Sequence, residues 1–215
     1  MTTPRDTTAV PVRHRLAWLA TEVFAPWVWV LGLPLAIAWH ATRQPLPALL
    51  WGLVVGITGS IIPMLVIVRG ARRGRWDGHH VTNREGRVVP FIACTSSLAI
   101  GVAVLVVGNA PHQMLALALA MFAALVTCVV ITFALPVGGT RGWKISLHAA
   151  VAAGASVILV VAYGPWLALS ALAVLLVDWS RVELGDHTRA QVIWGSVVGA
   201  VAGGAVYLLL LDALN

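Results

Sequence analysis

The sequence predicts an all-α protein, a polytopic membrane helix bundle of six to seven spans. Of its 215 residues, 60% are hydrophobic and only 10% are charged, whereas roughly a quarter of the residues in a soluble domain carry charge. The apolar stretches are about 20 residues long, which is the length needed to cross a hydrocarbon core of about 30 Å. Short turns rich in Gly, Pro or charge separate these stretches.

The chain divides into a polar N-terminal segment, residues 1–15, and a single transmembrane domain, residues 16–215. The N-terminus lacks a compact signal sequence with a small-residue cleavage site, so we expect the first apolar run to be retained. That run contains Pro26 and Pro34 and should be kinked. The seven apolar runs cover residues 16–39, 48–68, 89–107, 114–135, 144–163, 166–179 and 190–211.

Positive charge is distributed unevenly between the two sides that seven spans would create. All of the 14 Lys and Arg except Arg43 fall on the side of the N-terminus. The positive-inside rule therefore places this side in the cytoplasm of a bacterial-type plasma membrane. The net charge of +6 is then explained by lipid headgroups, and no nucleic-acid partner is expected.

The stretch from Ser180 to Gln191 is the most polar part of the second half of the chain. Starting within this stretch, residues spaced four apart are expected to lie on one face of the last helix. Glycines in such a stripe let another helix approach closely. We expect them to pack on the fifth helix, along a small-residue face with Ala152 and Ser156. The stripe comprises His187, Gln191, Gly195, Gly199 and Gly203.

A second polar segment precedes the fifth helix. Lys144 and His148 lie four residues apart, so one helical face would present both. The same packing would bring His148 near His187. Two imidazoles backed by arginines suit phosphoryl transfer through a covalent phosphohistidine, in which one ring attacks phosphorus and the other protonates the leaving oxygen.

These segments resemble the signatures of the type 2 phosphatidic acid phosphatase superfamily. Ser180-Arg181, five residues and His187 match its third signature, in which Asp stands where this chain has Gln191. Ser146 and His148 keep two residues of the second signature, Pro-Ser-Gly-His. Arg84 keeps the Arg of the first, which begins with Lys and ends in Arg-Pro. The resemblance covers residues 77–204 and implies a phosphatidic-acid-phosphatase-like core.

The resemblance implies an integral membrane phosphatase that hydrolyses a lipid or isoprenoid phosphate at the cytoplasmic leaflet. His187 would be the nucleophile and His148 the general acid. The phosphate would be held by Arg84, Arg181, Ser146 and Lys144. The orienting group of His187 would be Gln191, Glu183 or Asp186. No cofactor is implied, and no metal, because His79-His80 has no Cys or carboxylate partner in ligand spacing.

Two other classes of protein are compatible with the sequence. A catalytically inactive relative would bind anionic lipid as a scaffold, as the lost Lys, Pro, Gly and Asp of the signatures suggest. A transporter would need inverted repeats or paired broken helices, and neither is evident. Most loop arginines are interpreted as headgroup anchors. The sequence does not specify which lipid phosphate is the substrate, or whether it is a monophosphate or a diphosphate. It does not specify the oligomeric state either.

Overall fold

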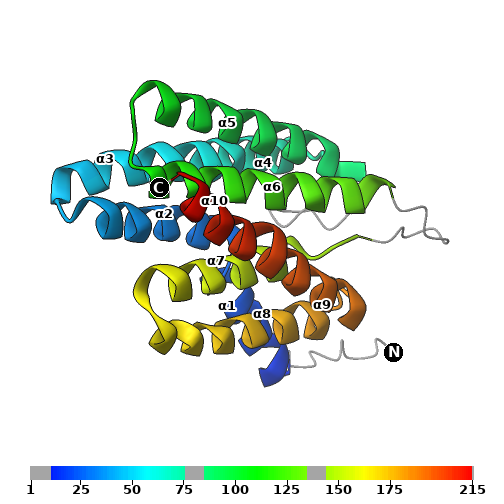
Figure 1. Cartoon of the computed structure of the whole chain (residues 1–215). Coiled ribbons are helices and arrows are strands. Elements are labelled where there is room, and N and C mark those ends of the chain that lie inside the picture. The colour runs from blue at the N-terminus through cyan, green and yellow to red at the C-terminus, as the bar shows by residue number, and fades with distance from the viewer. Residues whose placement is uncertain (1–10, 76–84, 135–143, 215) are drawn as a thin grey trace, which may run out of the picture.

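The computed structural model describes residues 11–75, 85–134 and 144–214, and within these ranges it is helical and contains no strand. Figure 1 shows the helices as a bundle. In chain order the elements are α1 (Val12–Val23), α2 (Pro26–Thr42), α3 (Pro45–Gly56), the π-helical η1 (Ile57–Ile61), α4 (Ile62–Arg72), the 3₁₀ helix η2 (Glu85–Arg87), α5 (Val88–Val107), α6 (His112–Ala134), α7 (Leu147–Tyr163), the 3₁₀ helix η3 (Pro165–Ser170), α8 (Ala171–Glu183), α9 (Arg189–Val198), the π-helical η4 (Gly199–Ala205) and α10 (Val206–Leu214).

The membrane-spanning character of the bundle follows from the length of its helices. Five continuous segments within the described ranges are long and apolar enough to cross a membrane, namely Pro45–Arg72, Val88–Val107, His112–Ala134, Pro165–Glu183 and Arg189–Leu214. α1 and α2 pass the same test only together, and α7 is apolar but has only 17 residues. Five helices, or six with the bent pair, therefore meet the requirement.

The first apolar run is divided at Pro26, as predicted, whereas Pro34 lies inside the continuous helix α2. α1 and α2 meet at an angle of 40°, and Pro26 begins α2, where its missing N–H is tolerated. α1 begins at Val12, inside the segment that was predicted to be polar and separate from the bundle. It packs against α8 through a hydrogen bond between the hydroxyls of Thr21 and Ser180 (3.0 Å).

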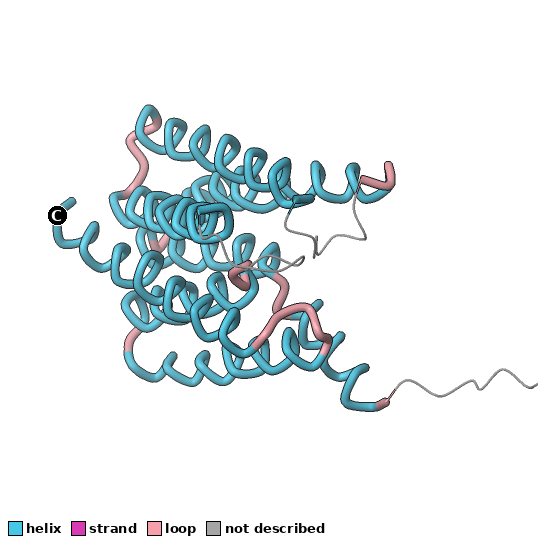
Figure 2. Tube along the Cα trace, turned by 90° about the vertical axis from the view of Figure 1, so that its right-hand side faces the viewer, coloured by secondary structure: helices cyan, strands magenta, loops and turns pink. Residues whose placement is uncertain are grey.

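The turns alternate between the two ends of the bundle. In Figures 1 and 2, the α2–α3, α5–α6 and α7–α8 connections lie at one end, and η2, the residues before α7 and the α8–α9 loop lie at the other. An ion pair between Arg13 and Glu183 (3.2 Å) ties the start of α1 to this second end. The described segments that were predicted to share one membrane face therefore gather at one end of the molecule.

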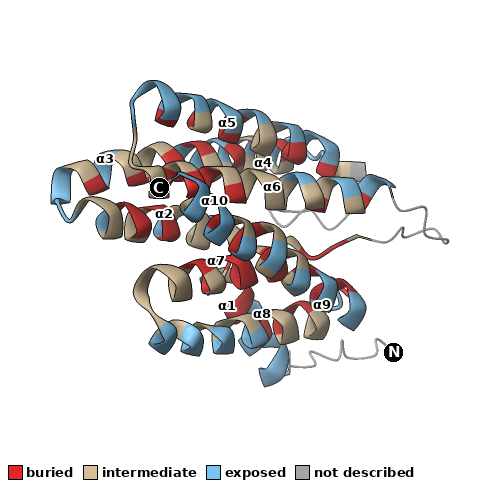
Figure 3. Cartoon of the chain, viewed as in Figure 1, coloured by how far each residue is buried: buried red, intermediate tan, exposed pale blue. Residues whose placement is uncertain are grey.

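α7 is the helix that the others surround. Nine of its residues are buried, and it contacts α2, α8, α9 and η4. Figure 3 shows this concentration of buried residues in the interior. An interior helix has no lipid-facing side, and small residues on several of its faces let the neighbouring helices approach.

The glycine stripe packs against α7, as predicted. A Cβ on Gly195 would lie 2.6 Å from the carbonyl oxygen of Ser146, and one on Gly199 would overlap the carbonyl of Ala150. A Cβ on Gly154 would in turn lie 2.9 Å from the carbonyl oxygen of Gly199. The face of α7 involved is therefore the one formed by Ser146, Ala150 and Gly154. The prediction that Ala152 and Ser156 form it is wrong.

Candidate active site

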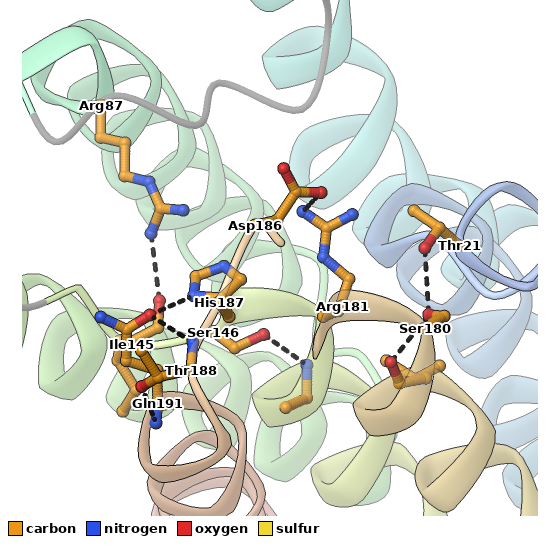
Figure 4. A network of polar contacts seen from close by, with 12 residues as sticks. Thr21, Arg87, Ile145, Ser146, Ser180, Arg181, Asp186, His187, Thr188 and Gln191 are labelled. Atoms are coloured by element: carbon orange, nitrogen blue, oxygen red, sulfur yellow. Dashed lines mark hydrogen bonds and ion pairs between the residues drawn. The ribbon is translucent and has the colours of Figure 1, made fainter. Parts of the chain in front are cut away.

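Four segments that are distant in the sequence converge at the end of the bundle where the polar loops gather. They are η2, residues 144–146 before α7, the last turn of α8, and residues 184–188 between α8 and α9. Figure 4 shows Arg87, Ser146, Arg181 and His187 in one region, with the guanidinium of Arg87 directed towards Ile145 and that of Arg181 towards Asp186. Arg87, Ser146, Arg181 and His187 are almost fully buried, with exposed fractions of 5%, 0%, 1% and 6% respectively.

The loop after α8 turns back so that His187 returns to the end of that helix. Its backbone N–H donates to the carbonyl of Arg181 (3.1 Å), and the N–H of Gly185 donates to that of Val182 (3.0 Å). Gly185 has φ of +72°, a conformation that glycine adopts without the steric cost of a Cβ. His187 precedes the last helix. Its predicted place on the face of that helix is therefore wrong, because the helix begins only at Arg189.

Gln191 holds the His187 ring and fixes its tautomer. Thr188 and Gln191 form a capping box, in which the N–H of Thr188 donates to Gln191 Oε1 (3.1 Å). Because a backbone N–H only donates, the amide atom facing it must be the oxygen. The same oxygen lies 3.1 Å from His187 Nδ1. Nδ1 therefore carries the proton, and the lone pair of the neutral ring is on Nε2.

The surroundings of His187 keep its ring neutral. Burial, together with the positive charges of Arg87, Arg181 and Lys144, lowers the pKa of His187 to about 2, although the hydrogen bond that the ring donates to Gln191 opposes this shift. An isolated imidazolium in this position would be both desolvated and repelled. In the unliganded protein, the ring of His187 is therefore uncharged throughout the neutral pH range.

Arg181 is a buried cation that is only partly paired. Its Nη2 lies 2.9 Å from Asp186 Oδ2, whereas Nε and Nη1 are buried and have no hydrogen-bond partner among the described residues. Unpaired donors of a buried charge are costly unless an anion meets them. Because Nη1 lies cis to Cδ, its N–H groups and the N–H of Nε point to different sides of the guanidinium, so each can donate to a separate oxygen acceptor.

Arg87 is the residue of this site that the sequence analysis missed. Its Nη1 donates to the carbonyl oxygen of Ile145 (3.0 Å). Burial and the charge of Arg181 lower the pKa of Arg87 to about 10, so it is still a cation at neutral pH. Arg84, which was chosen instead, lies outside the described residues, as do His79 and His80. The signal for Arg87 was its place as the last charged residue before the span of α5.

Ser146 joins α7 to α9 at the site. It is the N-cap of α7, with Oγ accepting from the N–H of Ala149 (3.4 Å). Its own N–H donates to the carbonyl of Gln191 (3.2 Å). A hydroxyl that accepts in this way can still donate to a bound oxygen. Lys144 lies before the helix starts, so the prediction that one helical face presents it together with His148 is wrong.

The two carboxylates proposed to orient His187 have other partners. Asp186 pairs with Arg181, and Glu183 pairs with Arg13. Of the three orienting candidates, only Gln191 makes a hydrogen bond to the ring in the described part of the chain. The site therefore holds its histidine with a neutral amide and uses the carboxylate of Asp186 to hold an arginine.

A cavity of about 230 Å³ adjoins the site on its membrane side. Arg87 and His148 line it at the end nearest the site, and its remaining wall is mostly apolar. His148 is the second residue of α7 and is 7% exposed. The structure thus brings together Ser146, Arg181, His187 and Gln191, adds Arg87, and puts His148 in the wall of this cavity.

Comparison of the chain with models of protein families, with curated proteins and with solved structures finds no match.

Proposed function

We propose that the protein is an integral membrane phosphatase that hydrolyses a lipid or isoprenoid phosphate through a phosphohistidine on His187. The observation that carries the proposal is the pairing of a nucleophile with an anion site. A neutral ring whose Nε2 lone pair is fixed by Gln191 lies beside a buried guanidinium with two unpaired nitrogens. Phosphoryl transfer requires these components, a positioned nucleophile and positive donors around the equatorial oxygens.

In the proposed reaction, the phosphate oxygens bind to Arg87, Arg181 and Ser146. His187 Nε2 attacks phosphorus, the P–N bond forms and the P–O bond to the lipid alcohol breaks. The leaving oxygen takes a proton from His148, which lines the cavity in which the chain of the alcohol would lie. Water then attacks the phosphohistidine and gives a proton to the now neutral His148. The P–N bond breaks, His187 is regenerated and inorganic phosphate is released. Lys144 adds positive charge near His187, and the cytoplasmic leaflet is the proposed side.

A test is the release of inorganic phosphate from a panel of lipid and isoprenoid mono- and diphosphates by the purified chain. We expect turnover that His187→Ala and Arg181→Ala abolish. His148→Ala should slow phosphate release from lipid phosphates much more than from 4-nitrophenyl phosphate, whose leaving group needs no protonation. Equal slowing of both substrates would contradict the role of His148 as general acid.

A second function is favoured by one observation, the neutral Gln191. An amide cannot balance the charge of an imidazolium or of a phosphohistidine as a carboxylate would. With Asp186 and Glu183 both paired to arginines, the site would then serve to bind the headgroup of an anionic lipid in a scaffold. Binding of these lipids by Arg87 and Arg181 without release of phosphate from any member of the panel would identify this function.

A further inference from the structure

The cavity beside the site has a polar end and an apolar body. Residues from α2, α4, α5, α6 and α7 line it, together with both π-helical turns. Arg87 and His148 are the basic side chains in its wall, and no carboxylate from the described part of the chain lines it. The side chains that close the far end are apolar, among them Leu98 and Ile158.

The length of the cavity corresponds to one leaflet of a bilayer. Along α7, the lining residues run from Leu147 to Ile158. At a rise of 1.5 Å per residue this is about 16 Å, which is roughly half of a hydrocarbon core of about 30 Å. A chain whose headgroup lies at the level of Arg87 would therefore occupy the cavity to its end without crossing into the second leaflet.

The cavity reaches the surface of the bundle beside α2. Trp27 lines it and is 40% exposed, and the hydroxyl of Ser60 donates to the carbonyl of Trp27 (2.9 Å). Ser60 and Gly59 belong to η1, and Gly199 and Gly203 of η4 line the cavity too. Such π-helical turns occur frequently at functional sites, and here two of them face one space.

We propose that this cavity holds one apolar chain of a phosphate ester, an acyl or isoprenoid chain whose phosphate lies at Arg87. The proposal rests on the proposed function and specifies where the substrate's chain is bound. The bilayer is as apolar as the cavity wall, so removal from lipid gives little driving force. The gain comes from filling the void, because its lining regains dispersion contacts, while Arg87 sets the direction of the chain.

The test uses the full chain in lipid nanodiscs and a hexadecyl phosphate that carries a diazirine near the end of its chain. After irradiation, we expect labelled peptides that contain Leu98 and Met121, which line the cavity on α5 and α6. Ala124→Phe, which fills the cavity from α6, should lower this labelling by about tenfold or more, equivalent to roughly 1.4 kcal/mol. Cys94→Phe, which fills it from α5, should do the same.

Val126→Phe is the matched control, because Val126 is on the same helix but exposed and does not line the cavity. It should leave the labelling at Leu98 and Met121 unchanged. Labelling confined to exposed positions such as Val126 and Val130, or equal labelling in both filled variants and the wild type, would overturn the proposal. Labelling does not need turnover. Cavity labelling without phosphate release would refute only the phosphatase, and release without cavity labelling would refute only the chain-binding cavity.

Discussion

At the scale of the residue, the proposed chemistry depends on how Gln191 holds His187. In serine-protease triads, replacing the carboxylate by an amide lowers the rate by about 10⁴ because the ring adopts the wrong tautomer. Here the N–H of Thr188 forces the amide oxygen towards Nδ1, so the ring has the tautomer that leaves Nε2 free to attack. The neutral amide thus keeps the geometry of a carboxylate while lacking its charge.

Substitution of Gln191 should therefore be severe. Gln191→Ala removes the acceptor for Nδ1–H and releases the tautomer, and we expect phosphate release to fall by about 10²-fold or more. Thr188→Ala is the control, because it loses the hydroxyl cap but keeps the backbone N–H that orients the amide. The two variants are compared by kcat/KM on one lipid phosphate. Similar losses in both would show that the cap matters and the ring orientation does not.

The two neighbouring carboxylates should differ in their effect on activity. Asp186→Asn removes the charge that fixes Arg181 at 2.9 Å, so KM should rise and kcat should fall as the phosphate loses its oriented donor. Glu183→Gln disturbs only the pair with Arg13, whose side chain is 73% exposed, and should change kcat/KM little, since exposed ion pairs contribute about 0–1 kcal/mol. A larger loss for Glu183→Gln would mean that the assignment of the carboxylates is reversed.

His187 should make the protein less stable in acid. Its pKa is lowered in the folded state from about 6.5 in the unfolded chain, so the unfolded state binds the proton more readily. Stability should be unaffected above pH 7 and should fall below pH 6.5, by about 2 kcal/mol at pH 5 from this group. His187→Asn should flatten the dependence of the Tm on pH. An unchanged slope in His187→Asn would contradict the buried, neutral ring.

Sequence reasoning found most of the residues of the site but not their partners. Ser146, Arg181, His187 and Gln191 were chosen from short motifs, and each lies in the cluster. Arg87 was missed because the signature match selected Arg84, and the place of Arg87 as the last charged residue before the span of α5 was not used. Its burial arises only where η2 meets Ile145. The sequence contains the Thr-x-x-Gln pattern of a capping box. This pattern predicts the orientation of the Gln191 amide, from which the tautomer of His187 follows once the two side chains are known to be in contact.

At the scale of the element, helix caps decided where the predicted motifs lie. Ser146 and Thr188 end the preceding coil and begin α7 and α9, so Lys144 and His187 precede their helices. A periodicity argument extends a helix through any compatible residues, whereas a capping side chain stops it. The glycine stripe was predictable because close packing requires it, but the partner face on α7 was not, since small residues occur on several of its faces.

The contact between α7 and η4 should be the least tolerant of the fold. Gly199→Leu would drive a side chain into the carbonyl of Ala150, separating Ser146 from α9 and abolishing phosphate release. Gly203→Ala is the control, because its Cβ would meet Gly154 Cα at 3.5 Å, an ordinary contact. Thermal unfolding and phosphate release are measured for both. Wild-type activity in Gly199→Leu would show that the close approach is not required.

At the scale of the whole molecule, the number of spans was harder to predict than their character. Hydropathy gave the membrane-spanning class correctly, and the alternation of turns brings the described site segments to one end. Hydropathy could not distinguish a lipid-facing span from the interior helix α7, because both are apolar. The break at Pro26, in contrast, was predictable from the sequence.

The orientation predicted from charge can be tested at the two ends of the bundle. Arg75 lies at the end of the polar loops and Gln44 at the other, and both are exposed. With the native cysteines replaced, Arg75→Cys should react in intact cells only with a membrane-permeant maleimide, and Gln44→Cys with an impermeant one as well, because Lys and Arg favour the cytoplasmic side. The opposite pattern would invert the topology.

The most direct test of the central claim is the detection of phosphate on His187. The chain in nanodiscs is mixed with a hexadecyl phosphate labelled with ³²P and quenched in alkali, which preserves a P–N bond. We predict label on the peptide that contains His187, lost on brief treatment with acid and absent in His187→Asn. Label that persists in His187→Asn, or phosphate release without any labelled peptide in rapidly quenched samples, would contradict the account.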